Sequence, residues 1–281
     1  MAHTQQTTSG SGLRSGPAVP PEESALGCRA VTRTFGAITA VDTVSIGIDD
    51  GEWVSIVGPN GAGKTTLLNV LNGFYDPDQT ADPQSGRIFL NGTDVTDAPT
   101  YRRARQGLGR TFQGLELYEE EDVIENVMAI RAVHDRPGLV SSLTYLGPGR
   151  QLEAESMRRV EEIIDYLELW EYRHSTVESL PLGIQRRVDL ARTLALEPDV
   201  LLLDEAMSGL TSDEKYDMFR FLADLHEQEG LTMVMIEHDL EVVTDVSGRM
   251  IVLHQGGVIA RGDPDAVVAD SEVRRIYTGV D

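Results

Sequence analysis

The chain has 281 residues, of which 41% are hydrophobic, and this is enough material for one large domain or two small ones. No stretch approaches the ~20 consecutive apolar residues of a membrane span, and one cysteine, Cys28, allows neither an internal disulfide nor a thiolate metal cluster. The formal net charge of −22 argues against a nucleic-acid-binding surface.

The acidic excess is unusual: 46 Asp and Glu stand against 24 basic residues, and only Lys64 and Lys215 of these are lysines. One interpretation is an acidic docking surface for a basic partner. The plainer interpretation is a solvated acidic coat over the whole protein. We favour the hypothesis that this coat suits a halophile-like cytosol of very high salt, where screening removes the self-repulsion.

The first elements in the chain are a tail and two strands. Residues 1–26 are rich in Ser, Thr, Gly and Pro and contain no apolar run like that of a signal peptide. We therefore expect a disordered tail and a protein that stays in the cytosol. Alternating apolar and polar residues predict half-buried strands at 30–35 and 42–48.

A glycine-rich motif follows a β-branched run at 53–57 that predicts a buried strand. The motif reads Gly58-Pro59-Asn60-Gly61-Ala62-Gly63-Lys64-Thr65 and matches the phosphate-binding loop pattern G-x-x-x-x-G-K-[ST]. Helical spacing from Thr65 to Leu71 places a helix N-terminus, with its unpaired amides, against an anion. An ordinary Gly-rich turn is the alternative, but a chance match is roughly two in a thousand.

The chemistry of this loop predicts a nucleoside triphosphate as ligand. The amides of residues 61–66, including that of Thr66, are expected to cradle the phosphates. Lys64 would reach the β- and γ-phosphates, and the Thr65 hydroxyl would ligate Mg²⁺.

The middle of the chain changes from strand to helix. Arg87–Leu90, followed by Asn91-Gly92, predicts a strand and a tight turn, and 101–107 predicts a short helix. From 116 to about 178 apolar spacing predicts one helix face at 123–130 and another at 163–169, with a break at 139–149. A further amphipathic helix is predicted at 187–196.

Two continuous apolar runs, 200–203 and 233–236, are typical of strands buried on both faces of a parallel sheet. Residues 250–253 and 258–260, around Gly256-Gly257, predict a terminal hairpin. The first run ends in Asp204 and Glu205. We expect Asp204 to help hold Mg²⁺ opposite Thr65, and Glu205 to orient or deprotonate the attacking water. A helix N-cap carboxylate would be the preferred interpretation in the absence of the glycine loop.

His238 follows the second run and emerges at the same sheet edge, so a contact with the γ-phosphate is plausible, although a lone histidine is more often structural. In this order the residues resemble the ATP-binding subunits of ABC transporters, over nearly the whole chain after the tail. The resemblance assigns Phe35 to adenine stacking, residues 58–65 to the Walker A loop and Gln113 to the Q-loop. It further assigns Asp204 and Glu205 to Walker B and the catalytic glutamate, 208–211 to the D-loop and His238 to the switch histidine.

The resemblance implies an α/β fold of the P-loop NTPase (ABC ATPase) type. This fold has a RecA-like core, an N-terminal antiparallel β-subdomain and an inserted α-helical subdomain at about 114–196, all within a domain of 27–281. It implies ATP and Mg²⁺ as ligands, with Gln113 as an additional metal ligand. It also implies that two ATPase domains pair head-to-tail around two ATPs, as a heterodimer or a homodimer.

In this family the ATPase lies at the cytoplasmic side of the membrane and drives two membrane permease subunits, supplied by an extracytoplasmic substrate-binding protein. The loop region 58–73, the string at 109–113, Ile236–Asp239 and the ending near 277–279 resemble the longer ATPase subunit of branched-chain amino acid importers. Urea and short-chain amide importers share much of this pattern and remain an alternative. So do a soluble, non-transport ABC ATPase and a slowly hydrolysing, nucleotide-gated binding module.

One motif departs from the family. Its signature, Leu-Ser-x-Gly-Gln, is replaced by Leu180-Pro181-Leu182-Gly183-Ile184. The serine hydroxyl that would bond the partner's γ-phosphate is absent, and we expect this loss to cost roughly 1.5–3 kcal/mol at that site. Gly183 still lets backbone amides approach a phosphate. Ala206 and Thr211 replace the proline and the D-loop acid of the family, and coupling to the membrane subunits is expected at 115–127.

The charge pattern generates a first prediction. If the acidic coat suits high salt, the melting temperature should rise by several degrees between about 0.1 and about 2 M KCl, because the salt screens the repulsion among carboxylates. A thermal melt in a KCl series measures this change. Loss of stability with added salt would end the hypothesis.

Overall fold

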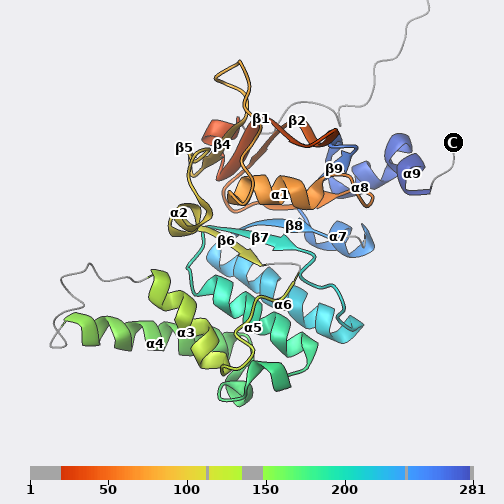
Figure 1. The fold of residues 1–281 in the computed structure, drawn as a ribbon. Coiled ribbons are helices and arrows are strands. Elements are labelled where there is room, and N and C mark those ends of the chain that lie inside the picture. The colour runs from red at the N-terminus through yellow and green to blue at the C-terminus, as the bar shows by residue number, and fades with distance from the viewer. Residues whose placement is uncertain (1–19, 112–113, 135–147, 238–239, 279–281) are drawn as a thin grey trace, which may run out of the picture.

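The computed structural model describes residues 20–111, 114–134, 148–237 and 240–278, and its fold is shown in Figure 1. Its centre is a six-stranded sheet in the order β10-β9-β3-β8-β7-β6. The strands are β3 (Trp53–Val57), β6 (Leu108–Thr111), β7 (Val200–Asp204), β8 (Thr232–Ile236), β9 (Arg249–His254) and β10 (Gly257–Gly262). Neighbouring strands run parallel except β10, which pairs antiparallel with β9.

The central strands are apolar along both faces, and this explains why they occur as continuous apolar runs in the sequence. Every residue of β3, β7 and β8 is buried. Alternate residues point to opposite faces of a strand. Leu201 and Leu203 accordingly join one hydrophobic cluster, whereas Val200 and Leu202 join the other.

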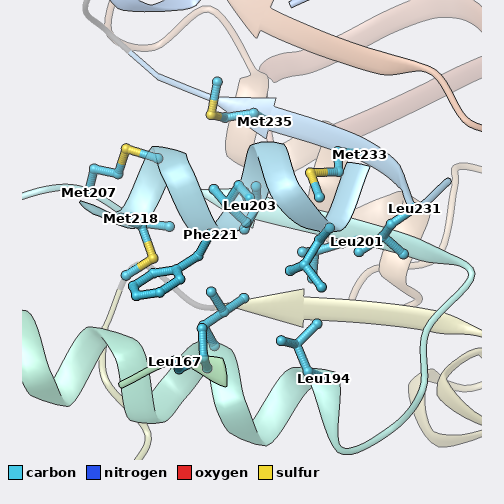
Figure 2. Packing of buried hydrophobic residues seen from close by; sticks show 14 of the residues in the cluster. Leu167, Leu194, Leu201, Leu203, Met207, Met218, Phe221, Leu231, Met233 and Met235 are labelled. Carbon is cyan, nitrogen blue, oxygen red and sulfur yellow. The ribbon is translucent and has the colours of Figure 1, made fainter. Parts of the chain in front are cut away.

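The first cluster lies between the sheet and the helices α5 (Leu182–Leu194) and α6 (Ser212–Glu229). Figure 2 shows Met233 and Met235 of β8 and Leu201 and Leu203 of β7 on one side of this cluster. Phe221 of α6 and Leu194 of α5 meet them from the helical side. Each of these side chains is buried.

The second cluster joins the opposite face to helix α1 (Lys64–Asn72) and to a four-stranded antiparallel sheet. That sheet has the order β2-β1-β4-β5. Its strands are β1 (Leu26–Phe35), β2 (Ile38–Ile48), β4 (Arg87–Leu90) and β5 (Thr93–Asp94). The turn between β4 and β5 has positive φ at Asn91 and Gly92, which a tight hairpin turn requires. Cys28 of β1 is fully buried in this cluster.

Helices form the remaining layer below the sheet, as Figure 1 shows for α3 to α6. This layer includes α3 (Val123–His134) and α4 (Pro148–Tyr166), and the short 3₁₀ helices Trp170–Tyr172 and Val177–Ser179. Helix α2 (Thr100–Arg105) instead lies beside the end of α1, as Figure 1 shows. Three more follow β8: α7 (Leu240–Val246), α8 (Pro264–Ala269) and α9 (Ser271–Thr278). Within the described part of the chain, no helix combines the length and apolar character needed to cross a bilayer.

The predicted α/β architecture, with an antiparallel sheet and helical segments, is confirmed, and several boundaries are corrected. The ordered chain begins before residue 27, because a 3₁₀ helix at Pro21–Glu23 and buried Ala25 and Leu26 pack against the antiparallel sheet. Residues 1–19 of the predicted tail and 139–147 of the predicted break lie outside the described residues, and residues 148 and 149 of that break belong to α4. The hairpin of β9 and β10 is not terminal, since α8 and α9 follow it.

Helices α5 and α6 differ from the prediction, and α7, α8 and α9 were not predicted. Helix α5 begins at Leu182 rather than 187, so it includes part of the altered signature. Helix α6 was missed, although its apolar residues Met218, Phe221, Leu222 and Leu225 have helical spacing. Thr211 and Glu214 form a capping box at its start, a sequence signal that could have found it.

A buried arginine fixes the end of α1 and generates a second prediction. Arg103 of α2 is fully buried and donates hydrogen bonds to the carbonyl oxygens of Val70, Leu71, Thr96 and Ala98, at 2.7 to 3.0 Å. Arg103→Met leaves these buried acceptors without that donor, so the free energy of unfolding should fall by roughly 2–4 kcal/mol in urea titration. The exposed neighbour Arg102→Met serves as the control, with a change within about 0.5 kcal/mol. Equal shifts for the two variants would contradict this role.

Candidate functional site

The loop between β3 and α1 is shaped by two glycines that have no room for a side chain. Gly58 has a φ of +152°, and a Cβ placed on it would lie 2.1 Å from the carbonyl oxygen of Leu253. Gly63 has a φ of +99°, and its Cβ would lie 2.0 Å from the carbonyl oxygen of Ala40. These contacts explain the glycine spacing of the motif in steric terms.

Lys64 opens α1 and is buried under the loop. Its Nζ donates hydrogen bonds to the carbonyl oxygens of Gly58, at 2.7 Å, and Pro59, at 3.1 Å. Burial lowers the pKa of this amine, while the nearby carboxylates of Glu205 and Asp204 act to raise it. The Lys64 ammonium is thus held at the inner side of the loop, close to both predicted acidic residues.

A hollow of about 600 Å³ lies over the loop. It is lined by Ala40, Asn60, Gly61, Ala62, Gly63, Lys64, Thr65, Thr66 and Glu205. Helix α1 begins here with Gly63 in the left-handed conformation, and no described side chain caps its first amides. A helix N-terminus with such amides, beside a lysine, is suited to bind a phosphate group.

Asp204 ends β7 and is 1% exposed. The Thr65 hydroxyl donates to its Oδ1 at 3.4 Å, and the Arg110 Nη2 donates to its Oδ2 at 2.9 Å. The two residues that the sequence analysis expects to hold Mg²⁺ therefore lie within hydrogen-bonding distance of each other. A hydroxyl and a carboxylate at this spacing are hard oxygen donors of the kind that Mg²⁺ prefers, so the donor set fits this ion.

Glu205 follows directly and lines the same hollow as the loop. Its φ of +50° is uncommon for a non-glycine residue, and its backbone N–H donates to the carbonyl oxygen of Ile236 at 3.0 Å. The turn after β7 is thereby tied to the end of β8. Backbone conformations of this kind concentrate at functional sites.

The altered signature lies away from this hollow. Pro181 stands at the N-cap of α5, Leu182 is 41% exposed and Gly183 is buried. A Cβ on Gly183 would lie 2.3 Å from Oε1 of Glu214 at the start of α6. The remaining two residues, Leu180 and Ile184, belong to or pack against the first hydrophobic cluster.

The other predicted site residues are Phe35, Gln113 and His238. Phe35 is 40% exposed, meets Tyr75 edge to face with ring centroids 5.2 Å apart and has the Arg33 guanidinium 4.9 Å from its ring centroid. It does not line the hollow. Gln113 and His238 lie outside the described residues.

Arg110 was missed as a site residue, because a sequence does not indicate which carboxylate a strand arginine will meet.

Comparisons with known proteins identify the family of this chain. A family model for the ABC transporter matches residues 41–208. The high-affinity branched-chain amino acid transport ATP-binding protein BraF of Pseudomonas aeruginosa is 32% identical over 89% of this chain and 95% of BraF. The corresponding protein LivG of Escherichia coli K12 is 34% identical over 87% of this chain and 94% of LivG.

Solved structures extend the similarity to the fold. The ADP conformation of MJ1267, an ATP-binding cassette of an ABC transporter, has a TM-score of 0.77 and 28% sequence identity. The match covers 91% of this chain and 98% of that cassette.

The glycine loop generates a third prediction. Gly63→Ala should weaken ATP binding by roughly 100-fold, because the new Cβ would displace the loop from the Ala40 carbonyl by an ångström or more. Calorimetric titration with ATP measures the affinity. Gly230→Ala is the matched control, since Gly230 also has positive φ but nothing lies within 4 Å of its Cβ position. Comparable affinities in the two variants would contradict the steric argument.

Proposed function

Because the chain belongs to the ABC transporter family, we propose that it is the ATP-binding and ATP-hydrolysing subunit of a branched-chain amino acid importer. The cargo follows from BraF and LivG, whose names specify branched-chain amino acid transport and which match over nearly their whole length. In this proposal the subunit lies against the cytoplasmic side of the membrane. Two permease subunits form the transport path, and an extracytoplasmic binding protein delivers the substrate.

One observation carries the proposal: Lys64, Thr65 and Glu205 line one hollow, with Asp204 bonded to Thr65 beneath it. These four residues come from α1 and from the end of β7. The arrangement combines a cation, a helix N-terminus, a pair of oxygen donors and a second carboxylate. Phosphoryl transfer needs these groups around a triphosphate.

Binding begins with the phosphates in the loop. The amide N–H groups at the start of α1 would donate hydrogen bonds to the phosphate oxygens. The Lys64 Nζ would exchange the carbonyl oxygens of Gly58 and Pro59 for the β- and γ-phosphates. Phe35, the last residue of β1, would stack on adenine. Its partly exposed ring has space for such a partner.

Thr65, Asp204 and Gln113 would hold Mg²⁺. When bound, this ion neutralises phosphate charge and favours displacement at the γ-phosphate. Glu205 would orient the attacking water and accept its proton, and His238 would contact the γ-phosphate. The turn that ties Glu205 to β8 also fixes the direction from which its carboxylate enters the hollow.

The signature Leu180–Ile184 would act on the nucleotide of a second ATPase subunit, in a heterodimer or a homodimer. None of the five signature residues lines the hollow of its own chain, and this is consistent with such a role. Gly183 has no side chain, but the Glu214 carboxylate fills the space beside it and would have to move before a phosphate could approach the Gly183 backbone. Pro181 offers neither a hydroxyl nor an N–H, so we propose a weakened composite site rather than an inactive one.

Two substitutions test the proposal. Glu205→Gln should lower the ATPase rate by roughly 100- to 10,000-fold, because it removes the base but keeps the shape of the side chain. Lys64→Ala should remove detectable heat of association with Mg-ATP, because the buried cation at the phosphates is lost. Steady-state ATPase assays, with and without the permease subunits, and calorimetry measure these changes.

The two variants distinguish binding from hydrolysis. Glu205→Gln is expected to retain ATP affinity, so it serves as the folded, ATP-binding control for Lys64→Ala. No heat of association in the wild type, together with an unchanged Lys64→Ala variant, would overturn the function. Equal and negligible ATPase rates in all variants, with normal binding, would instead favour a nucleotide-gated binding module.

A further inference from the structure

Arg110 occupies a position in the fold that the proposed chemistry has not used. It lies in β6, next to β7, and its side chain is only 4% exposed. Its Nη2 is 2.9 Å from Oδ2 of Asp204, and its Nη1 donates to Oδ1 of Asn69 at 2.7 Å. Burial lowers the pKa of the guanidinium, and the Asp204 carboxylate opposes that shift. One buried arginine therefore joins β6, β7 and α1.

These contacts close a ring of polar groups. Thr65 and Asn69 are four residues apart in α1, so their side chains share one face of the helix. Thr65 reaches Oδ1 of Asp204 directly, whereas Asn69 reaches Oδ2 through Arg110. The two oxygens of the carboxylate are thus assigned to different partners. Rotation of the carboxylate would break both contacts.

We propose that Arg110 is a positioning residue that fixes the Asp204 carboxylate with Oδ1 toward the Thr65 hydroxyl, and that Asn69 holds the arginine in place. The inference rests on the proposed function, because Oδ1 and the Thr65 hydroxyl are the donors assigned to Mg²⁺. Arg110 itself does not line the hollow and acts through Asp204. A planar guanidinium can bridge two acceptors in a fixed fork, which an ammonium cannot do.

A purely structural ion pair is the competing interpretation, and the chain contains a suitable comparison. Arg249 of β9 is also buried and pairs with Glu52, its Nε lying 2.6 Å from Oε1. It is located at the start of β9, next to Val54 of β3, and so away from the loop end of the sheet. Removal of Arg249 should therefore affect stability alone.

The experiment compares ATP affinity in Mg²⁺ and in EDTA, by calorimetry, in the hydrolysis-deficient Glu205→Gln background. The parent should bind ATP more tightly in Mg²⁺. Arg110→Met should weaken binding in Mg²⁺ by roughly 10- to 100-fold, the effect of a lost hydrogen bond to a charged group. Its affinity in EDTA should change by less than about threefold, since the loop amides and Lys64 are intact.

Further variants separate positioning from folding. Arg110→Lys keeps the charge but lacks the planar fork, so it should recover only part of the ATP affinity in Mg²⁺ that Arg110→Met loses. Asn69→Ala should also weaken ATP binding in Mg²⁺, but by less than Arg110→Met. Arg249→Met should lower the melting temperature and leave the ratio of the two affinities unchanged. If Arg110→Met shows no cooperative melt, Arg110→Lys and Asn69→Ala carry the test.

Each outcome is decisive. An unchanged ratio in the Arg110 and Asn69 variants, an increased Mg²⁺ effect, or an equal loss in Mg²⁺ and EDTA would overturn the positioning role. A parent whose ATP affinity is the same in Mg²⁺ and EDTA would overturn the magnesium site itself, and the positioning role with it. A parent that binds no ATP would overturn the proposed function.

Discussion

The phosphate loop is held between the two sheets by backbone contacts on both sides. The carbonyl oxygens of Ala40, in β2, and Leu253, in β9, lie where side chains on Gly63 and Gly58 would project. The turn between β9 and β10 adds two hydrogen bonds, from the Gly256 N–H to Ala62 and from the Asp42 N–H to Gly256. The loop is thereby positioned near the end of β7, and its lysine and hydroxyl lie close to the acidic residues there.

The acidic and basic side chains of the site determine how it can accommodate a triphosphate. Two carboxylates, Asp204 and Glu205, act on the ammonium of Lys64, and Arg110 neutralises one of them. A triphosphate would add several negative charges next to these carboxylates. A divalent cation held by Asp204 and Thr65 would relieve this repulsion, so nucleotide and metal are expected to bind together.

Features that depend on residues close together in the sequence could be predicted, whereas contacts between distant residues could not. The strands at 200–203 and 233–236 were predicted well because burial on both faces makes them apolar throughout. The glycine loop was recognisable because its spacing reflects backbone sterics. Helix α6 was overlooked because its exposed face is highly charged, which obscures four apolar residues. Arg110 could not be identified, since its partners lie 41 and 94 positions away.

The burial of Cys28 in β1 has a practical consequence for spectroscopy. Burial raises the pKa of this thiol to about 12, so almost none of it is thiolate at neutral pH. Since the chain contains no other cysteine, a single cysteine introduced on the surface would be the sole reactive site for a fluorophore or a spin label. Pairs of such labels could then test whether two ATPase subunits approach each other during turnover, as proposed above, without background from the native sequence.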